Sequence, residues 1–389
     1  MADPIVRIAA RGDGVSESGR HVAYAVPGDL LRDDGTIDPG PHHQVPPCRH
    51  FPECGGCQLQ HVDDAAYRDY LVSRVFGALA QHELDTEILE PHLSPPRSRR
   101  RATLKATKAG GRVLIGFHGA KTHHIVDMRE CHVLRPELFN LVAPLRSLLD
   151  PWLGKNRSAE IGMSLIEGGI DLTLKGVDPE GFEAQERLVD FAQANGLARL
   201  SIDRGLGPEA VFEPNPAVVA LSGRLVAFPP SSFLQATEDG EAALVEAVRM
   251  ALAGSAHVAD LFAGLGTFAL ALDADHAAEA GRDQAAALSR AAPAMRVEHR
   301  DLYRRPLDPD ELANFDGVVL DPPRAGAEEQ VQRLAGSRVA KIAYVSCNPA
   351  TFARDAKMLV DNGYKLDWVR PVGQFRWSTH IELAGSFSR

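Results

Sequence analysis

Long apolar runs are absent from this sequence of 389 residues. None approaches the roughly 20 residues that a helix needs to span a membrane, and the first eleven residues lack the apolar core of a signal peptide. We therefore expect a cytoplasmic protein without a membrane partner. A net positive charge is absent too, because the formal net charge is -10. This balance argues against a protein that coats nucleic acid with its whole surface.

Basic residues are nevertheless dense in one segment. Residues 97–112 hold seven arginines and lysines and no acidic residue. The seven are Arg97, Arg99, Arg100, Arg101, Lys105, Lys108 and Arg112. Such a run indicates contact with the phosphates of a nucleic acid, although a merely solvated surface has the same composition.

Cysteine is scarce and unevenly distributed. Of the five cysteines, Cys48, Cys54 and Cys57 are close together, Cys131 follows far downstream, and Cys347 stands apart. In a cytosolic chain such a group predicts metal binding in preference to disulfides. The two glycines between Cys54 and Cys57 let the backbone bend tightly, so that both thiolates can face one centre. With Cys131 the set has four ligands, which suits a [4Fe–4S] cluster or a structural zinc ion.

The length predicts two or three domains. Residues 1–45 alternate short apolar segments with glycine turns, which predicts a small β module, too short for a complete five-stranded barrel, with residues 33–47 as a linker. Residues 46–225 hold the cysteine group, the basic run and several strand patterns, which predicts a β-rich domain that handles the substrate. In residues 226–389 strands and helices alternate, which predicts an α/β domain.

The first strand of this α/β domain leads into a glycine turn and a helix at residues 257–268. Position 269 is alanine, so the third glycine of a dinucleotide fingerprint is absent. With Asp260 in the strand, the pattern fits the first strand of an S-adenosylmethionine methyltransferase instead. The carboxylate expected to hold the ribose hydroxyls is then Glu279, at the end of the next strand, and Asp301 is expected to face the adenine.

Two later strand ends carry reactive side chains. One strand ends in Asp321-Pro-Pro-Arg324, and residues 339–345 form a buried strand that leads into Cys347. In open α/β sheets, ligands bind outside the carboxyl ends of the strands. Enzymes that methylate exocyclic amines carry an aromatic residue at the position of Arg324, so arginine here, followed by a strand-end cysteine, predicts a ring carbon as the target. The alternative for Cys347 is a small buried apolar residue.

A carbon target gives the cysteine a chemical role. A thiolate that adds to carbon 6 of a pyrimidine makes carbon 5 nucleophilic toward the sulfonium methyl group. A base must then remove the proton from carbon 5 so that the cysteine can be eliminated. The candidate is Glu382, on a strand expected to return beside that of Cys347. The alternative for Glu382 is a surface position on an edge strand.

These motifs together resemble the RNA uracil-5-methyltransferases, specifically the iron–sulfur branch that makes 5-methyluridine in 23S ribosomal RNA. The resemblance runs from about residue 5 to the C-terminus, and its most specific motifs are Asp-Pro-Pro-Arg, Ser-Cys-Asn-Pro and Cys-Gly-Gly-Cys. It implies an α/β, Rossmann-like class I methyltransferase domain at the C-terminus. It also implies a β-rich central domain with an iron–sulfur cluster and a short, curtailed TRAM module, which is OB-like, at the N-terminus.

The resemblance further implies roles for individual residues. Cys347 is the expected nucleophile and Glu382 the expected base. The expected neighbours of S-adenosylmethionine are Gln235, Phe262, Thr267, Glu279, Asp301 and Asp321, of which Gln235 and Asp321 also lie near the uracil. The expected ligands of a [4Fe–4S] cluster are Cys48, Cys54, Cys57 and Cys131.

The implied partner is RNA, in particular 23S ribosomal RNA, and the chain is expected to act as a monomer. The family usually has asparagine where this sequence has Thr267, so a hydroxyl would make that contact. Two alternatives stay open: the same reaction on transfer RNA, and a catalytically silent RNA-binding module.

Overall fold

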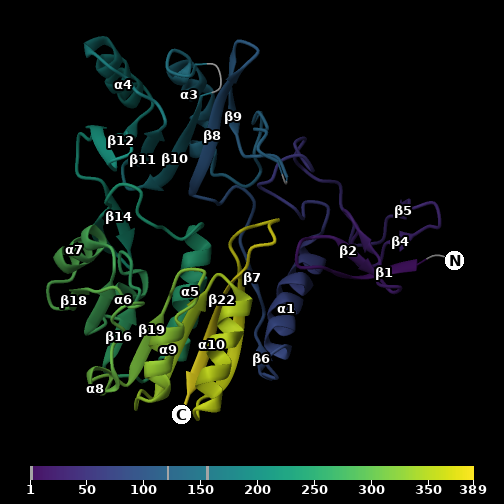
Figure 1. Cartoon of the computed structure of the whole chain (residues 1–389), viewed down its shortest axis with the longest axis vertical. Helices are drawn as coiled ribbons and strands as arrows, with labels where there is room; N and C mark the ends of the chain where they lie inside the picture. Colours follow the sequence, from purple (N-terminus) through teal and green to yellow (C-terminus); the bar gives the residue numbers. More distant parts are fainter. Residues whose placement is uncertain (1–2, 121, 155–156) are drawn as a thin grey trace.

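The computed structural model describes residues 3–120, 122–154 and 157–389; Met1 and Ala2 of the predicted N-terminal module lie outside this set. Three larger sheets and a two-stranded hairpin organise the chain. In Figure 1 the central sheet lies above the largest sheet, and the N-terminal sheet lies to one side of both. None of the described helices combines the length and the apolarity that a membrane crossing requires.

The N-terminal sheet is antiparallel, with strand order β3-β2-β1-β4-β5. Its strands are β1 (Asp3–Ile8), β2 (Gly14–Ser16), β3 (His21–Val22), β4 (Leu30–Leu31) and β5 (Ile37–Asp38). Ile5, Ala25 and Leu31 form its small core. The prediction of a linker over residues 33–47 is wrong at β5, because this two-residue strand pairs with β4. So short a strand leaves no periodicity that a sequence pattern can reveal.

The central sheet has six strands in the order β13-β12-β11-β10-β8-β9. They are β8 (Arg101–Ala109), β9 (Arg112–Gly116), β10 (Ser158–Ile166), β11 (Gly169–Lys175), β12 (Leu197–Asp203) and β13 (Pro208–Phe212). The helices of this region are α2 (Pro136–Asn140), α3 (Val142–Leu149) and α4 (Phe182–Ala194). All strand pairs are antiparallel except β11 with β12. Parallel strands need a long crossover, and α4 provides it.

The largest sheet has the order β18-β17-β16-β19-β20-β22-β21-β6, and β7 also pairs with β21. Its strands are β16 (Val258–Leu261), β17 (His276–Glu279), β18 (Arg296–His299), β19 (Gly317–Leu320), β20 (Lys341–Ser346), β21 (Lys365–Gly373), β22 (Glu382–Ser388), β6 (Glu87–Ile88) and β7 (His92–Leu93). Strands β16 to β20 are parallel, whereas β22 runs antiparallel between β20 and β21. The strand order reverses between β16 and β19, which is where such sheets open a ligand crevice.

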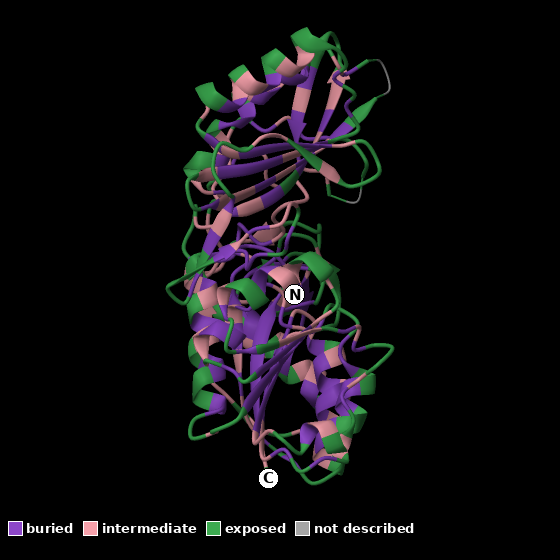
Figure 2. Cartoon of the chain, turned by 90° about the vertical axis from the view of Figure 1, so that its left-hand side faces the viewer, coloured by how far each residue is buried: buried purple, intermediate pink, exposed green. Residues whose placement is uncertain are grey.

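Helices cover both faces of this sheet. They are α1 (Asp64–Ala80), α5 (Glu238–Ala251), α6 (Thr267–Ala271), α7 (Arg282–Ala291), α8 (Pro309–Leu312), α9 (Glu328–Ala335) and α10 (Pro349–Asp361). One core joins the sheet to α1, α9 and α10, and another joins it to α5, α6 and α7. Figure 2 shows the strands of both large sheets mostly buried. Burial on both faces explains why strands such as Gly317–Leu320 are continuously apolar.

Two segments of the predicted central domain, residues 46–225, pack against the C-terminal sheet. Helix α1 contributes Tyr67 and Leu71 to the core of the largest sheet, and β6 and β7 pair with β21. The hairpin β14 (Val218–Leu221) and β15 (Arg224–Ala227) packs against the other face. Residues 64–93, which the sequence places in the central domain, therefore belong structurally to the C-terminal sheet. Local patterns indicate a helix but not the sheet against which it packs.

Candidate active site

A cavity of about 810 Å³ lies at the carboxyl ends of β16, β19 and β20 and extends to the cysteine loop. All twelve residues chosen from the sequence line it. They are Cys48, Cys54, Cys57, Cys131, Gln235, Phe262, Thr267, Glu279, Asp301, Asp321, Cys347 and Glu382. The carboxyl ends of the parallel strands share one edge of the sheet and bring Phe262, Asp321 and Cys347 together, and the cysteine loop closes over the same space from a distant part of the chain.

At one end of the cavity, backbone geometry is tightly specified. Phe262 adopts a positive φ of 67°, a conformation that side chains rarely occupy outside functional sites. Gly266 has a φ of 93°, and a Cβ there would lie 2.4 Å from Leu288 Cδ1. Glycine is therefore required at the start of α6. The Gly264 and Gly281 N–H groups donate to the two carboxylate oxygens of Glu279 at 2.8 and 2.6 Å, so Glu279 ties the two turns together.

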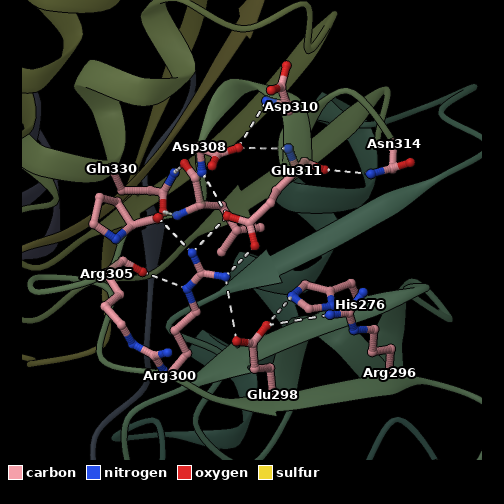
Figure 3. A network of polar contacts seen from close by, with 12 residues as sticks. His276, Arg296, Glu298, Arg300, Arg305, Asp308, Asp310, Glu311, Asn314 and Gln330 are labelled. Carbon is pink, nitrogen blue, oxygen red and sulfur yellow. Dashed lines mark hydrogen bonds and ion pairs between the residues drawn. The ribbon is translucent and has the colours of Figure 1, made fainter.

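The loop that carries Asp301 is held by an ion-pair network, which Figure 3 shows from close by. The Arg300 guanidinium donates to both carboxylate oxygens of Glu311 at 2.6 and 2.8 Å. It also donates to the carbonyl oxygens of Arg305 and Pro306. Hydrogen bonding by Arg300 lowers the pKa of Glu311 to about 2. Because Arg300 directly precedes Asp301, this network fixes the loop from behind the cavity.

Cys347 and Glu382 lie at the ends of adjacent strands, as the sequence predicts. Cys347 is the residue after β20, and Glu382 opens β22, which pairs with β20. Glu382 is only 5% exposed, which rules out the surface alternative. Burial, followed by the Glu382 charge, raises the pKa of the Cys347 thiol to about 11, against the opposing effect of the Arg324 guanidinium. Asn348 caps α10, so the thiol also lies beside the positive end of a helix.

A second carboxyl group adjoins this pair. Burial raises the pKa of Asp321 to about 7. Burial, followed by the charge of Asp321, raises the pKa of Glu382 to about 8, against the opposing effects of Arg101 and Gln374. A carboxyl group with a pKa in this range is suited to exchange protons near neutral pH. The site can therefore supply both a thiol and a proton acceptor to one reacting ring.

The four remaining cysteines also line the cavity. Burial, together with the charges of Cys131, Cys54 and Cys48, raises the pKa of Cys57 to about 12, against a lowering by Gln60. Such mutual effects require thiols that are near one another. In residues 3–120, 122–154 and 157–389, however, no three His, Cys, Asp or Glu side chains are close enough to hold a single metal ion.

The cysteine loop is attached to the segment that precedes Glu382. The backbone N–H groups of Gln58 and Leu59 donate to the Trp377 carbonyl oxygen at 2.8 and 2.9 Å. The Thr379 N–H in turn donates to Gln58 Oε1 at 3.3 Å. Hydrogen bonds therefore join the cysteine loop directly to the segment that leads into Glu382.

Comparison with known proteins identifies the family. A family profile described as tRNA (Uracil-5-)-methyltransferase matches residues 285–388. An uncharacterized RNA methyltransferase of Zymomonas mobilis is 48% identical, with 99% of each chain covered. The 23S rRNA (uracil(1939)-C(5))-methyltransferase RlmD of Pectobacterium atrosepticum is 32% identical over 90% of this chain and 81% of that protein. The chain belongs to the RNA uracil-5-methyltransferase family.

This RNA uracil-5-methyltransferase depends on S-adenosylmethionine and methylates carbon 5 of uracil in RNA. A crystal structure of a Pyrococcus abyssi tRNA (uracil-54, C5)-methyltransferase in complex with S-adenosyl-L-homocysteine superposes with a TM-score of 0.77. It covers all of this chain and 99% of that one, at 23% identity. The superposition shows that the methyltransferase has the class I fold, as the sequence predicts.

The basic run of the methyltransferase divides into different environments. Arg100 is buried and donates to Glu241 at 2.5 Å, so it is not available to a phosphate. Lys105 and Lys108 are paired with Glu160 and Asp150. Arg99 and Arg101 instead line the cavity. The interpretation of the whole run as one phosphate-binding surface is therefore wrong at Arg100, because a partner 141 residues away neutralises it.

Three residues that line the cavity were not predicted from the sequence. Phe233 is 58% exposed, and the Arg101 guanidinium lies 4.6 Å from its ring centre. His380 Nδ1 lies 3.3 Å from an Arg324 nitrogen, and the Phe375 ring stacks under Arg99 at 5.2 Å. Phe233 lies two residues before Gln235, and Phe375 and His380 precede Glu382, so proximity to chosen residues was the available signal.

Proposed function

We propose that this enzyme methylates carbon 5 of a specific uridine in 23S ribosomal RNA through a covalent bond between Cys347 and carbon 6. The observation that carries the proposal is the placement of Cys347 and Glu382 on neighbouring strands of one cavity. The 32% identity to a 23S rRNA enzyme over most of both chains supports the substrate.

The chain's own residues supply each step. Arg324 and the start of α10 stabilise the Cys347 thiolate, which adds to carbon 6. Carbon 5 then takes the methyl group of S-adenosylmethionine, leaving S-adenosylhomocysteine. Glu382 accepts the proton of carbon 5, and electrons from that C–H bond form the 5,6 double bond as the Cys347 thiolate leaves.

Cofactor and RNA share the cavity. S-adenosylmethionine would be held by six residues that line the cavity: Gln235, Phe262, Thr267, Glu279, Asp301 and Asp321. Of these, Gln235 and Asp321 would also lie near the uracil. The exposed Phe233 ring offers a surface on which an extruded base can stack. Arg99 and Arg101 face the same space and are suited to the RNA backbone.

The substrate assignment is tested with purified enzyme, labelled S-adenosylmethionine, and RNA from a strain that lacks the gene. We expect 23S ribosomal RNA to accept the label at one or two uridines and transfer RNA to accept none. Labelling of transfer RNA alone would contradict the assignment while leaving the chemistry in place. The family profile described for tRNA makes this the relevant comparison.

We further propose that Cys48, Cys54, Cys57 and Cys131 hold a [4Fe–4S] cluster. Four thiols that line one cavity match its four ligands. In such a cluster each thiolate binds a different iron, so the thiols need not converge on a single ion as zinc ligands do. When bound, the cluster would cross-link the cysteine loop to the segment around Cys131. Methyl transfer of this kind needs no electron from it. Reduced thiols and an RNA substrate both fit the cytoplasm.

Anaerobically purified protein is expected to contain about four irons and matching sulfide per chain. Cys131→Ser should lose most of this iron and its visible absorbance, because one of four ligands is removed. Cys347→Ser is the matched control and should retain both, since Cys347 is not one of the four proposed ligands. Zinc in place of iron in the anaerobic protein would contradict the cluster.

The pH dependence of kcat/KM follows from Glu382. Its pKa of about 8 means that this carboxyl is mostly protonated at pH 7 in the free enzyme. Because the ionised form accepts the proton, kcat/KM is expected to rise as pH increases from about 6.5 to 8.5. Initial rates on 23S ribosomal RNA over this range measure the effect. A rate that falls across the range would contradict Glu382 as the base.

A further inference from the structure

Gln374 occupies a buried position between two residues of the proposed site. It directly follows β21 and is 1% exposed. The Ala236 N–H donates to Gln374 Oε1 at 2.8 Å, and Gln374 Nε2 donates to Gln235 Oε1 at 2.8 Å. Gln374 also lies close enough to Glu382 to lower the pKa of that carboxyl, against the larger effect of burial. One amide is thus near both a proposed uracil neighbour and the proposed base.

The orientation of both amides follows from a single backbone group. A backbone N–H can only donate, so the Gln374 atom that faces Ala236 must be the oxygen. The other end of Gln374 is then the NH₂ group, which can only donate, so the Gln235 atom that it meets must also be an oxygen. This order leaves the NH₂ group of Gln235 as the end that remains for a ligand in the cavity.

Close packing holds Gln374 in this position. Gly240, in the first turn of α5, lies so near that a Cβ there would be 2.7 Å from Gln374 Cβ and 3.3 Å from its Oε1. The side chain is therefore enclosed by α5 on one side and bonded at both amide ends. Because Gln374 is held in one orientation, it also fixes which end of the Gln235 amide is the oxygen and which is the NH₂ group.

Uracil and cytosine differ where this polarity matters. The group on carbon 4, next to the reacting carbon 5, is a carbonyl acceptor in uracil and an amino donor in cytosine. We propose that Gln374 is a positioning residue that selects uridine over cytidine by holding the Gln235 NH₂ group toward the base. A donor at that point pairs with the uracil carbonyl and meets the cytosine amino group with a second donor. This inference rests on the proposed placement of Gln235 beside the base.

The test compares two RNA fragments of 23S ribosomal RNA that carry either U or C at the mapped target. The rate of methylation and the dissociation constant are measured for each fragment. The wild-type enzyme should strongly prefer the U fragment. In Gln374→Met the donor is lost and Gln235 is free to turn, so the U-to-C ratio of dissociation constants should move toward one by about tenfold.

Gln330→Met is the matched control. Gln330 is also 1% exposed, and it bonds both backbone groups of Leu307, remote from the base. Gln330→Met should lower the melting temperature without changing the ratio of the dissociation constants for the U and C fragments. If Gln374→Met weakens both fragments equally, as a purely structural residue would, the inference is overturned.

Gln235→Glu provides a second, independent variant. With Gln374 donating to one carboxylate oxygen, the other presents an acceptor to the base, so relative affinity should shift toward the C fragment. An unchanged preference for U would overturn the inference even if Gln374→Met failed to fold. If the wild-type enzyme did not methylate the U fragment, the proposed function would fail first, and the two failures are thereby distinguished.

Discussion

Cys347→Ala is expected to abolish methyl transfer to RNA, lowering kcat by at least about 10⁴-fold. Carbon 5 of uracil is a poor nucleophile, and only addition of a nucleophile at carbon 6 gives it enough electron density to attack the sulfonium. In the described part of the chain, the other four cysteines also line the cavity, but the charges that shift the pKa of Cys347 come from Glu382, Arg324 and Asp321 and not from another cysteine. No neighbouring thiol is therefore placed to replace Cys347. Transfer of labelled methyl groups to 23S ribosomal RNA in a single turnover measures the loss.

The variant should keep its other properties. S-adenosylmethionine affinity and RNA affinity are expected to change less than about threefold, because the thiol is half-buried and alanine removes only its sulfur atom. A catalytically silent RNA-binding module would give the same affinities but no wild-type turnover to lose. Substantial methylation by Cys347→Ala would contradict the covalent mechanism.

Glu382→Gln is expected to stop the reaction after methyl transfer instead of before it. The amide is nearly isosteric but cannot accept the proton of carbon 5, so the cysteine cannot be eliminated. A methylated RNA should therefore remain bound to the protein through Cys347. It should appear as a band of reduced mobility on a denaturing gel, at a yield approaching one RNA per enzyme.

The double variant Cys347→Ala/Glu382→Gln controls this result and should show no such band. Omission of S-adenosylmethionine is a second control, because the unmethylated adduct reverses by simple elimination. Normal turnover by Glu382→Gln, with no retained RNA, would assign proton removal to another group. The nearest candidate is then Asp321, whose burial raises its pKa to about 7.

The sequence predicts the C-terminal sheet well where each strand is short, apolar and followed by a polar turn. Strand β17 (His276–Glu279) ends at Glu279 and β19 (Gly317–Leu320) ends directly before Asp321, as expected. Phe262, Asp301, Asp321 and Cys347 gather because each follows the carboxyl end of a parallel strand, and Glu382 joins them because β22 begins at the same edge of the sheet. The roles of Cys347 and Glu382 follow from the chemistry, because methylation of a ring carbon requires both a thiol and a base.

Long-range packing was not predictable in the same way. Arg100 has the same local surroundings as Arg99 and Arg101, and only its ion pair with Glu241 removes it from the cavity. Helix α1 carries an apolar face that either large sheet could bury. Gln374 is a lone glutamine at a strand end, and its meaning depends on Gln235, 139 positions away. Such pairs become visible only when the chain is folded.

Mass spectrometry of the trapped Glu382→Gln complex tests the central claim most directly. After digestion of protein and RNA, we expect a peptide that contains Cys347 with one uridine nucleotide attached. The mass of the attached nucleotide should show one added methyl group. Attachment to any other residue, or a nucleotide without the methyl group, would contradict covalent catalysis by Cys347.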